Sequence, residues 1–154
     1  MIPTLLVMYE QSVRSRERAT GDKKSFPNRG NYEKLEKHNS RELGLLGEEA
    51  VSYFYNEPLC NTPDYDLIVA GERVEVKSKA INVLGLKSWF EVNVFNGRKY
   101  DKKCDYYMFT IIRNMLVVKL VGYISKEDFD RISITGNANG VPNKGVKLYQ
   151  LKEC

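Results

Sequence analysis

Residues 62–78 read TPDYDLIVAGERVEVKS, and this stretch predicts two short strands joined by a tight turn. Residues 67–70 are an apolar run, and Gly71 can adopt the backbone conformation that a turn requires. After the turn, Val74 and Val76 alternate with charged residues, which is typical of a strand with one buried face. The stretch therefore predicts a β-hairpin inside a larger sheet.

The charged residues of this hairpin gather on one face. Successive side chains of a strand point to opposite faces, so Glu75 and Lys77 share one face, as Asp64 and Asp66 do on their own strand. A turn at residues 70–71 places Asp66 opposite Glu75, whereas a turn one residue later places Asp66 opposite Lys77. Both registers predict a patch that contains an aspartate, a glutamate and a lysine.

This patch predicts a metal site. Side chains that face each other across two strands have Cβ atoms about 5 Å apart, and like charges at that distance are destabilising. Mg²⁺ relieves the repulsion, because it binds one or two carboxylates and completes its shell with water and phosphate oxygens. A lysine nearby can hold a phosphate or activate the attacking water. We expect a metal-dependent phosphodiesterase with Mg²⁺ as cofactor and Mn²⁺ as its substitute.

Length and composition are those of one soluble domain. The chain has 154 residues, of which 42% are hydrophobic and 29% are charged. The net charge of +4 is compatible with a polyanionic partner. No apolar run approaches the roughly 20 residues that span a bilayer, and residues 1–8 lack the features of a signal peptide. Three widely spaced cysteines, Cys60, Cys104 and Cys154, predict free thiols and a cytoplasmic protein without membrane contact.

The N-terminal quarter is basic. Residues 11–41 carry nine Lys or Arg side chains against four acids, and Gly21, Pro27 and Gly30 break any period. The sequence therefore predicts a basic arm over residues 1–40 and a folded domain over residues 41–154. The arm contacts a phosphate backbone, or it is a solvated extension or a dimerisation arm. Residues 2–8 are a short strand or the start of this arm.

A helix is predicted between the arm and the hairpin. Asn39 and Glu42 have the spacing of a capping box, and Pro58 lies just past the expected end. Glu48 and Glu49 flank its apolar stripe and either face solvent or reach the acidic patch. That stripe consists of Leu43, Leu46, Gly47, Ala50 and Phe54.

The remainder predicts a sheet with one more short helix. We expect a third strand at residues 88–94, a basic loop or short helix at 96–104, and a buried hairpin formed by 105–112 and 115–124. A helix capped by Ser125 is expected to end at Ile132, followed by a loop at 135–145 and an edge strand at 146–151. The fold class is therefore α/β, with a mixed central β-sheet flanked by helices.

Pro63 with Asp64 or Asp66, followed by Glu75-Val76-Lys77, resembles the signature of the PD-(D/E)XK nuclease superfamily. Many restriction endonucleases and archaeal Holliday-junction resolvases share this fold. The Gly47-Glu48 pair in the preceding helix is similar to the Gly-x-Glu helix of many members. The resemblance covers residues 43–124 and implies a restriction-endonuclease-like αβββαβ core.

The resemblance also implies roles for individual residues. Asp66 or Asp64, Glu75 and the Val76 carbonyl would bind the metal, and Lys77 would orient or activate water. Asp66 is favoured over Asp64 because it lies directly at the start of the strand. Glu48 would be an accessory ligand, preferred to Glu49 on the Gly-Glu match alone.

The expected function is a metal-dependent DNA endonuclease that acts in recombination, repair, restriction or degradation of foreign DNA. Small members of the superfamily often pair, so a homodimer is one expected state. Two alternatives remain open at this stage. One is a catalytically silent nucleic-acid-binding or assembly module on a nuclease fold, and the other is a plain α/β domain in which Asp66, Glu75 and Lys77 form ordinary cross-strand ion pairs.

Overall fold

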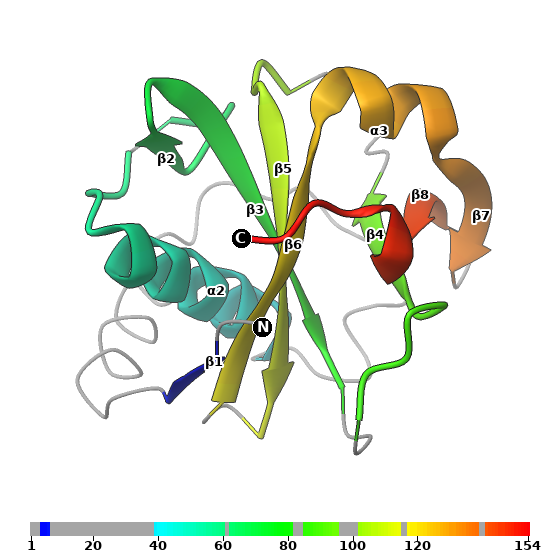
Figure 1. Cartoon of the computed structure of the whole chain (residues 1–154), viewed down its shortest axis with the longest axis horizontal. Coiled ribbons are helices and arrows are strands. Elements are labelled where there is room, and N and C mark those ends of the chain that lie inside the picture. Colours follow the sequence, from blue (N-terminus) through cyan, green and yellow to red (C-terminus); the bar gives the residue numbers. More distant parts are fainter. Residues whose placement is uncertain are drawn as a thin grey trace.

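The protein has an α/β fold in which a mixed five-stranded sheet is flanked by helices (Figure 1). The computed structural model describes residues 4–6, 39–60, 62–81, 85–95, 102–114, 117–138 and 141–154. The strand order is β1-β6-β5-β3-β2, and only β3 and β5 are parallel neighbours. These strands are β1 (Thr4–Leu6), β2 (Leu67–Val69), β3 (Glu72–Ala80), β5 (Tyr106–Arg113) and β6 (Val117–Ser125).

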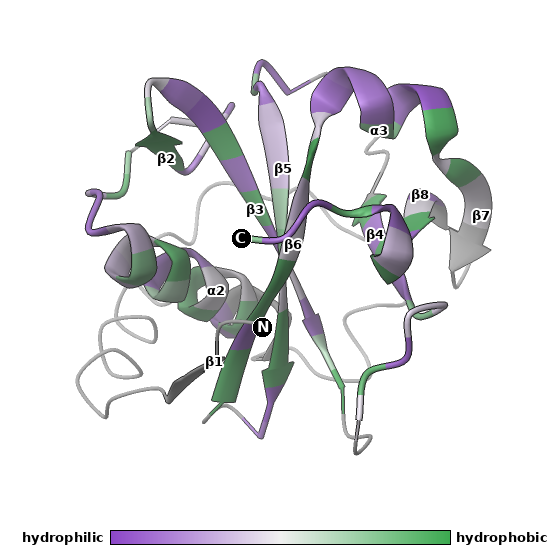
Figure 2. Ribbon diagram, viewed as in Figure 1, coloured by the Kyte–Doolittle hydropathy of each residue, from purple (hydrophilic) through white to green (hydrophobic). Residues whose placement is uncertain are grey.

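Helix α2 (Asn39–Tyr55) covers one face of this sheet (Figure 1). Its buried Leu46 and Ala50 pack with Val74 and Val76 of β3 in one core cluster. The predicted helix and most of its apolar stripe are confirmed. The prediction that Phe54 belongs to the buried stripe is wrong, because 39% of its surface is exposed. Figure 2 shows hydrophobic residues along β5 and β6 where these strands run past α2.

Gly47 lets the helix approach the sheet closely. A Cβ atom at this position would lie 1.9 Å from Ser78 Oγ and 2.6 Å from Thr110 Oγ1. Both distances are far below van der Waals contact, so only glycine fits without a shift of these side chains or of the elements that carry them. Gly47 therefore fixes α2 over the middle of the β3–β5 pair.

A second layer covers the opposite face (Figure 1). It contains helix α3 (Lys126–Ile132) and a three-stranded sheet of order β4-β8-β7. A separate core lies between this layer and the central sheet and includes Phe109, Phe129 and Val146. The three strands are β4 (Glu91–Phe95), β7 (Ile134–Ala138) and β8 (Val141–Lys147).

This second sheet differs from the prediction. The third strand exists as β4, but it pairs with β8 instead of joining the central sheet. The predicted loop at 135–145 is wrong, because β7 and most of β8 lie there. The edge strand predicted at 146–151 is confirmed only for Val146 and Lys147, which end β8, the middle strand of this sheet. A short 3₁₀ helix, Leu148–Gln150, follows instead of the remainder. Pairing with β4 and β7 overrides the weak strand preference of Gly, Asn and Pro.

The hairpin of β5 and β6 is confirmed, but only β5 has the predicted burial on both faces. β5 is buried on both faces, as predicted, but β6 alternates buried with half-buried residues such as Lys119 and Tyr123. Helix α3 is confirmed, and the Ser125 hydroxyl caps it by accepting a hydrogen bond from the Asp128 amide at 3.1 Å.

The N-terminal arm is described only in part. Residues 4–6 form β1, which pairs with β6, whereas residues 7–38, with His38, lie outside the described residues. The division at residue 40 therefore stays a prediction. Residues 96–101 of the basic connection also lie outside them. All three cysteines are free, and no helix among the described residues is long and apolar enough to cross a membrane.

Candidate metal centre

The β2–β3 hairpin adopts the first of the two predicted registers. Val69 pairs with Glu72, so the turn residues are Ala70 and Gly71, with φ angles of 51° and 84°. Positive φ at both turn positions is the geometry of a type I′ turn, whose twist matches that of the flanking strands. The register places Asp66, just before β2, opposite Glu75.

The Asp66 carboxylate is held over the backbone of β3. Its Oδ2 accepts a hydrogen bond of 2.7 Å from the Val76 amide, and its own amide donates to the Val74 carbonyl at 2.8 Å. The Cys60 amide donates to the Asp66 carbonyl at 2.6 Å. These contacts fix the position of Asp66 from both sides of the residue.

Glu75 is the buried acid of the site, with only 3% of its surface exposed. Its Oε1 lies 2.5 Å from Lys77 Nζ and 3.0 Å from Lys102 Nζ. Its Oε2 is buried, and no group in the described part of the chain donates a hydrogen bond to it. A buried carboxylate oxygen without a donor costs free energy, so a cation at this oxygen would be stabilising.

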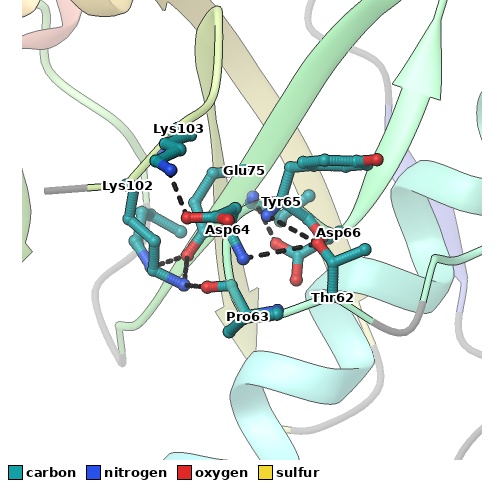
Figure 3. Close-up of polar contacts among 10 residues, drawn as sticks. Thr62, Pro63, Asp64, Tyr65, Asp66, Glu75, Lys102 and Lys103 are labelled. Atoms are coloured by element: carbon teal, nitrogen blue, oxygen red, sulfur yellow. Dashed lines mark hydrogen bonds and ion pairs between the residues drawn. The ribbon is translucent and has the colours of Figure 1, made fainter. Parts of the chain in front are cut away.

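Lys102 reaches the site from the segment that precedes β5. Its ammonium lies between Glu75 Oε1 and the Pro63 carbonyl oxygen and donates a hydrogen bond to that carbonyl (Figure 3). The sequence placed this lysine only in a basic loop or short helix at residues 96–104. The contact between Lys102 and Glu75 could not be predicted, because the two residues are far apart in the sequence and no motif surrounds Lys102.

Asp64 lies at the rim of the site. Its Oδ1 accepts a hydrogen bond of 3.2 Å from the Lys103 amide and so ties residues 62–65 to the segment that carries Lys102 (Figure 3). The Thr62 hydroxyl supports the same turn, because it donates to the Tyr65 carbonyl at 2.9 Å. Asp66, in contrast, lies opposite Glu75.

The electrostatics of the site reflect a buried acid, Glu75, close to a half-buried one, Asp66. Burial, followed by the negative charge of Glu75, raises the pKa of Asp66 from 3.8 to about 6, although the Val76 amide and the two lysines oppose the shift. Burial and the same glutamate raise the pKa of the Cys104 thiol to about 11. The ionised form of Asp66 is therefore disfavoured in this site.

Glu48 and Glu49 are half-buried on α2. This helix packs on the face of β3 that carries Val74 and Val76, whereas alternation directs Glu75 to the opposite face. The structure thus brings Asp66, Glu75 and Lys77 together, and it places Glu48 on the helix that covers the other face of the sheet.

The face of β3 that carries Glu75 and Lys77 also carries Lys79. Lys79 Nζ donates to the Glu91 carbonyl at 3.0 Å and to Asn93 Oδ1 at 2.9 Å, and Glu91 Oε2 accepts from Lys147 at 3.1 Å. Burial lowers the pKa of Lys79, and the Glu91 charge opposes the shift. Sequence reasoning missed this group, because β4 and β8 come to β3 only through tertiary packing.

The donor set suits a hard cation. The described residues contain no group of three or more His, Cys, Asp or Glu side chains arranged around one point. Asp66 and Glu75 are two carboxylates, and backbone carbonyls and water would supply the remaining oxygens. Mg²⁺ keeps several waters and needs only one or two carboxylates, so these residues fit Mg²⁺ or Mn²⁺ better than Zn²⁺.

The sequence matches no family model and no curated protein. A functional proposal therefore depends on the geometry of the site and on the fold that carries it.

Proposed function

We propose that the protein is a metal-dependent endonuclease that hydrolyses phosphodiester bonds in DNA. The observation that carries the proposal is Glu75: it is 3% exposed, it lies opposite Asp66, and its Oε2 lacks a donor among the described residues. A divalent cation between the two carboxylates would satisfy this oxygen and remove their repulsion.

The fold supports the proposal at the level of architecture. The order of helix α2, the β2–β3 hairpin and the parallel β3–β5 pair is compatible with the αβββαβ core proposed from the resemblance to the PD-(D/E)XK superfamily. β4 departs from this core, since it belongs to the second sheet. The proposed assignment therefore relies on the hairpin and its acids more than on the third strand.

Each residue of the site has a proposed role. Asp66 and Glu75, with the Val76 carbonyl, would hold Mg²⁺, whereas Glu48, on the helix that covers the opposite face of β3, is not assigned to this ion. The metal would polarise the phosphoryl group and lower the pKa of a bound water. Lys77, which lies 2.5 Å from Glu75, would orient the attacking water and hold a phosphate oxygen. Asp64 would order the rim through Lys103.

DNA is the proposed substrate because phosphate recognition suits the charges around the site. Lys77, Lys102 and Lys103 lie on or beside it, and the whole chain carries a net charge of +4. A cytoplasmic homodimer would supply one site for each strand of a duplex. Recombination, repair and degradation of foreign DNA are roles that suit such an enzyme.

The test is incubation with Mn²⁺ or Mg²⁺ and a panel of plasmid, linear, branched and single-stranded DNA. We expect cleavage that requires the metal. Lys77→Ala should reduce the cleavage rate by at least about 100-fold, because positioned proton-transfer groups typically contribute that much. Lys152→Ala is the matched control, since this exposed lysine lies beyond β6 and should leave cleavage unchanged. Undiminished nicking by the Lys77 variant would refute its assigned role.

One observation favours a second candidate, the catalytically silent nucleic-acid-binding module. Lys77 and Lys102 already supply two positive charges to the two carboxylates, so the cluster can be neutral without metal. This candidate predicts salt-sensitive DNA binding in a gel shift and no cleavage of any substrate in the panel.

A further inference from the structure

Lys102 supplies a positive charge to the Glu75 carboxylate on Oε1, the oxygen beside the Oε2 that lacks a donor among the described residues and that a divalent cation would bind. Its ammonium contacts one carboxylate oxygen, Glu75 Oε1 at 3.0 Å, and one backbone carbonyl oxygen, that of Pro63 (Figure 3). Carboxylate and carbonyl oxygens are also the ligands that Mg²⁺ prefers. In the protein alone, the lysine thus supplies the charge that a metal would supply.

We propose that Lys102 is an internal cation that competes with the divalent metal for Glu75 and is released when the metal binds. The inference rests on the proposed function, because it takes the Asp66–Glu75 pair as the metal site. It assigns Lys102 a positioning role in metal uptake, which the signature residues do not include.

The two lysines at Glu75 differ in how they are held. Lys77 is two residues from Glu75 on the same face of β3, so the strand itself keeps it there. Lys102 comes from a separate segment, and 30% of its side chain is exposed. Its flexible stem allows the ammonium to leave while the backbone stays in place.

The backbone around Lys102 is anchored independently of its ammonium. On one side, the Lys103 amide donates to Asp64 at 3.2 Å. Further along, Asp105 accepts hydrogen bonds of 2.8 and 2.7 Å from the Arg73 guanidinium. Release of the ammonium therefore requires rotation of one side chain only.

Release has a consequence for substrate binding. A metal ion on Glu75 repels the nearby ammonium, which then becomes available to a phosphate oxygen at the rim. Because such coupling is reciprocal, metal should strengthen DNA binding through Lys102, and DNA should strengthen metal binding.

The experiment compares Mn²⁺ affinity, measured by calorimetry, of the wild type, Lys102→Met and Lys103→Met. Lys103 is a matched control, since it is exposed and meets Asp64 through its backbone. Removal of the competing charge should lower the Mn²⁺ dissociation constant of Lys102→Met by at least about fivefold, the lower end of typical coupling. Lys103→Met should bind Mn²⁺ as the wild type does.

A second measurement uses the unmodified sequence and so does not depend on folding of a variant. Mild acetylation followed by mass spectrometry reports the reactivity of each lysine. Saturating Mg²⁺ should raise the reactivity of Lys102 relative to Lys103, because the ammonium leaves Glu75.

The outcomes separate this inference from the proposed function. The competition would be overturned if Lys102→Met bound Mn²⁺ no more tightly than the wild type. It would also be overturned if Mg²⁺ left the acetylation reactivity of Lys102 unchanged. Either result would leave the proposed metal site intact. Absence of Mn²⁺ binding in the wild type and in Lys102→Met would overturn the proposed function as well.

Discussion

The two faces of strand β3 differ in what they contribute to the protein. The face toward α2 carries Val74, Val76 and Ser78, which are packed against the helix so closely that Gly47 has no room for a side chain. The face toward the second layer carries Glu75, Lys77 and Lys79 in one row. The first face stabilises the fold, and the second holds charges that a stable core would not need.

The difference shows where stability and function are separated in this molecule. Burial of two valines is favourable by about 1.5–3 kcal/mol for each side chain. Burial of a glutamate beside an aspartate is costly unless cations lie beside it. Strand alternation places both kinds of side chain on adjacent residues, so substitutions on the two faces should have opposite effects.

The largest effect is expected at the packed face. Gly47→Ala should lower the free energy of unfolding by about 2–4 kcal/mol, because its Cβ would overlap Ser78 Oγ and Thr110 Oγ1. Urea denaturation followed by circular dichroism measures this loss.

Gly44→Ala is the matched control in the same helix. Nothing lies within 4 Å of a Cβ at this position, so the change should stabilise the protein by up to about 1 kcal/mol through helix propensity. Equal effects of the two substitutions would show that α2 does not pack closely on β3.

An effect of opposite sign is expected at the charged face. The folded state raises the pKa of Asp66 from 3.8 to about 6, so the protonated form stabilises the fold below pH 4 and this contribution is lost as the pH rises through 6. Asp66→Asn stays neutral at all pH values. Without metal at pH 8, it should therefore raise the free energy of unfolding by about 1–3 kcal/mol.

The pH dependence distinguishes this gain from a packing effect. The advantage of Asp66→Asn over the wild type should shrink between pH 7 and pH 4 in the presence of a chelator. Glu72→Gln, on the exposed side of the same hairpin, serves as the control and should leave stability unchanged at both pH values. A loss of stability in the Asp66 variant at pH 8 would mean that the acids do not repel each other.

The smallest effect concerns the hydrogen bond between Ser78 and Thr110, whose hydroxyl oxygens lie 2.8 Å apart. Ser78→Ala removes one partner and should cost about 1 kcal/mol, the typical net value of such a bond. In the Gly47→Ala background the same change should cost less than in the wild type, since it also removes the closest clashing atom. Additive losses in the double variant would contradict the contact.

Local patterns were sufficient to predict much of this arrangement. The Gly71 turn, the alternation around Val74 and the helical spacing before it predicted the hairpin and its helix. They left two registers open for Asp66, opposite Glu75 or opposite Lys77, and only the structure distinguishes them. Lys102 and Lys79 could not be predicted, because their partners come from distant segments. β7 and most of β8 were missed for the same reason: their composition resembles a loop, and they become strands only because β8 pairs with β4 and β7 pairs with β8.

The central claim is that Asp66 and Glu75 bind a divalent cation. A Mn²⁺ titration of the wild type and of Asp66→Asn at pH 8, followed by electron paramagnetic resonance of free Mn²⁺, tests it most directly. We predict that the wild type removes one or two Mn²⁺ per chain from solution and that Asp66→Asn, although folded and more stable, removes none at the same concentrations. Equal binding by both proteins, or binding by neither, would contradict the claim.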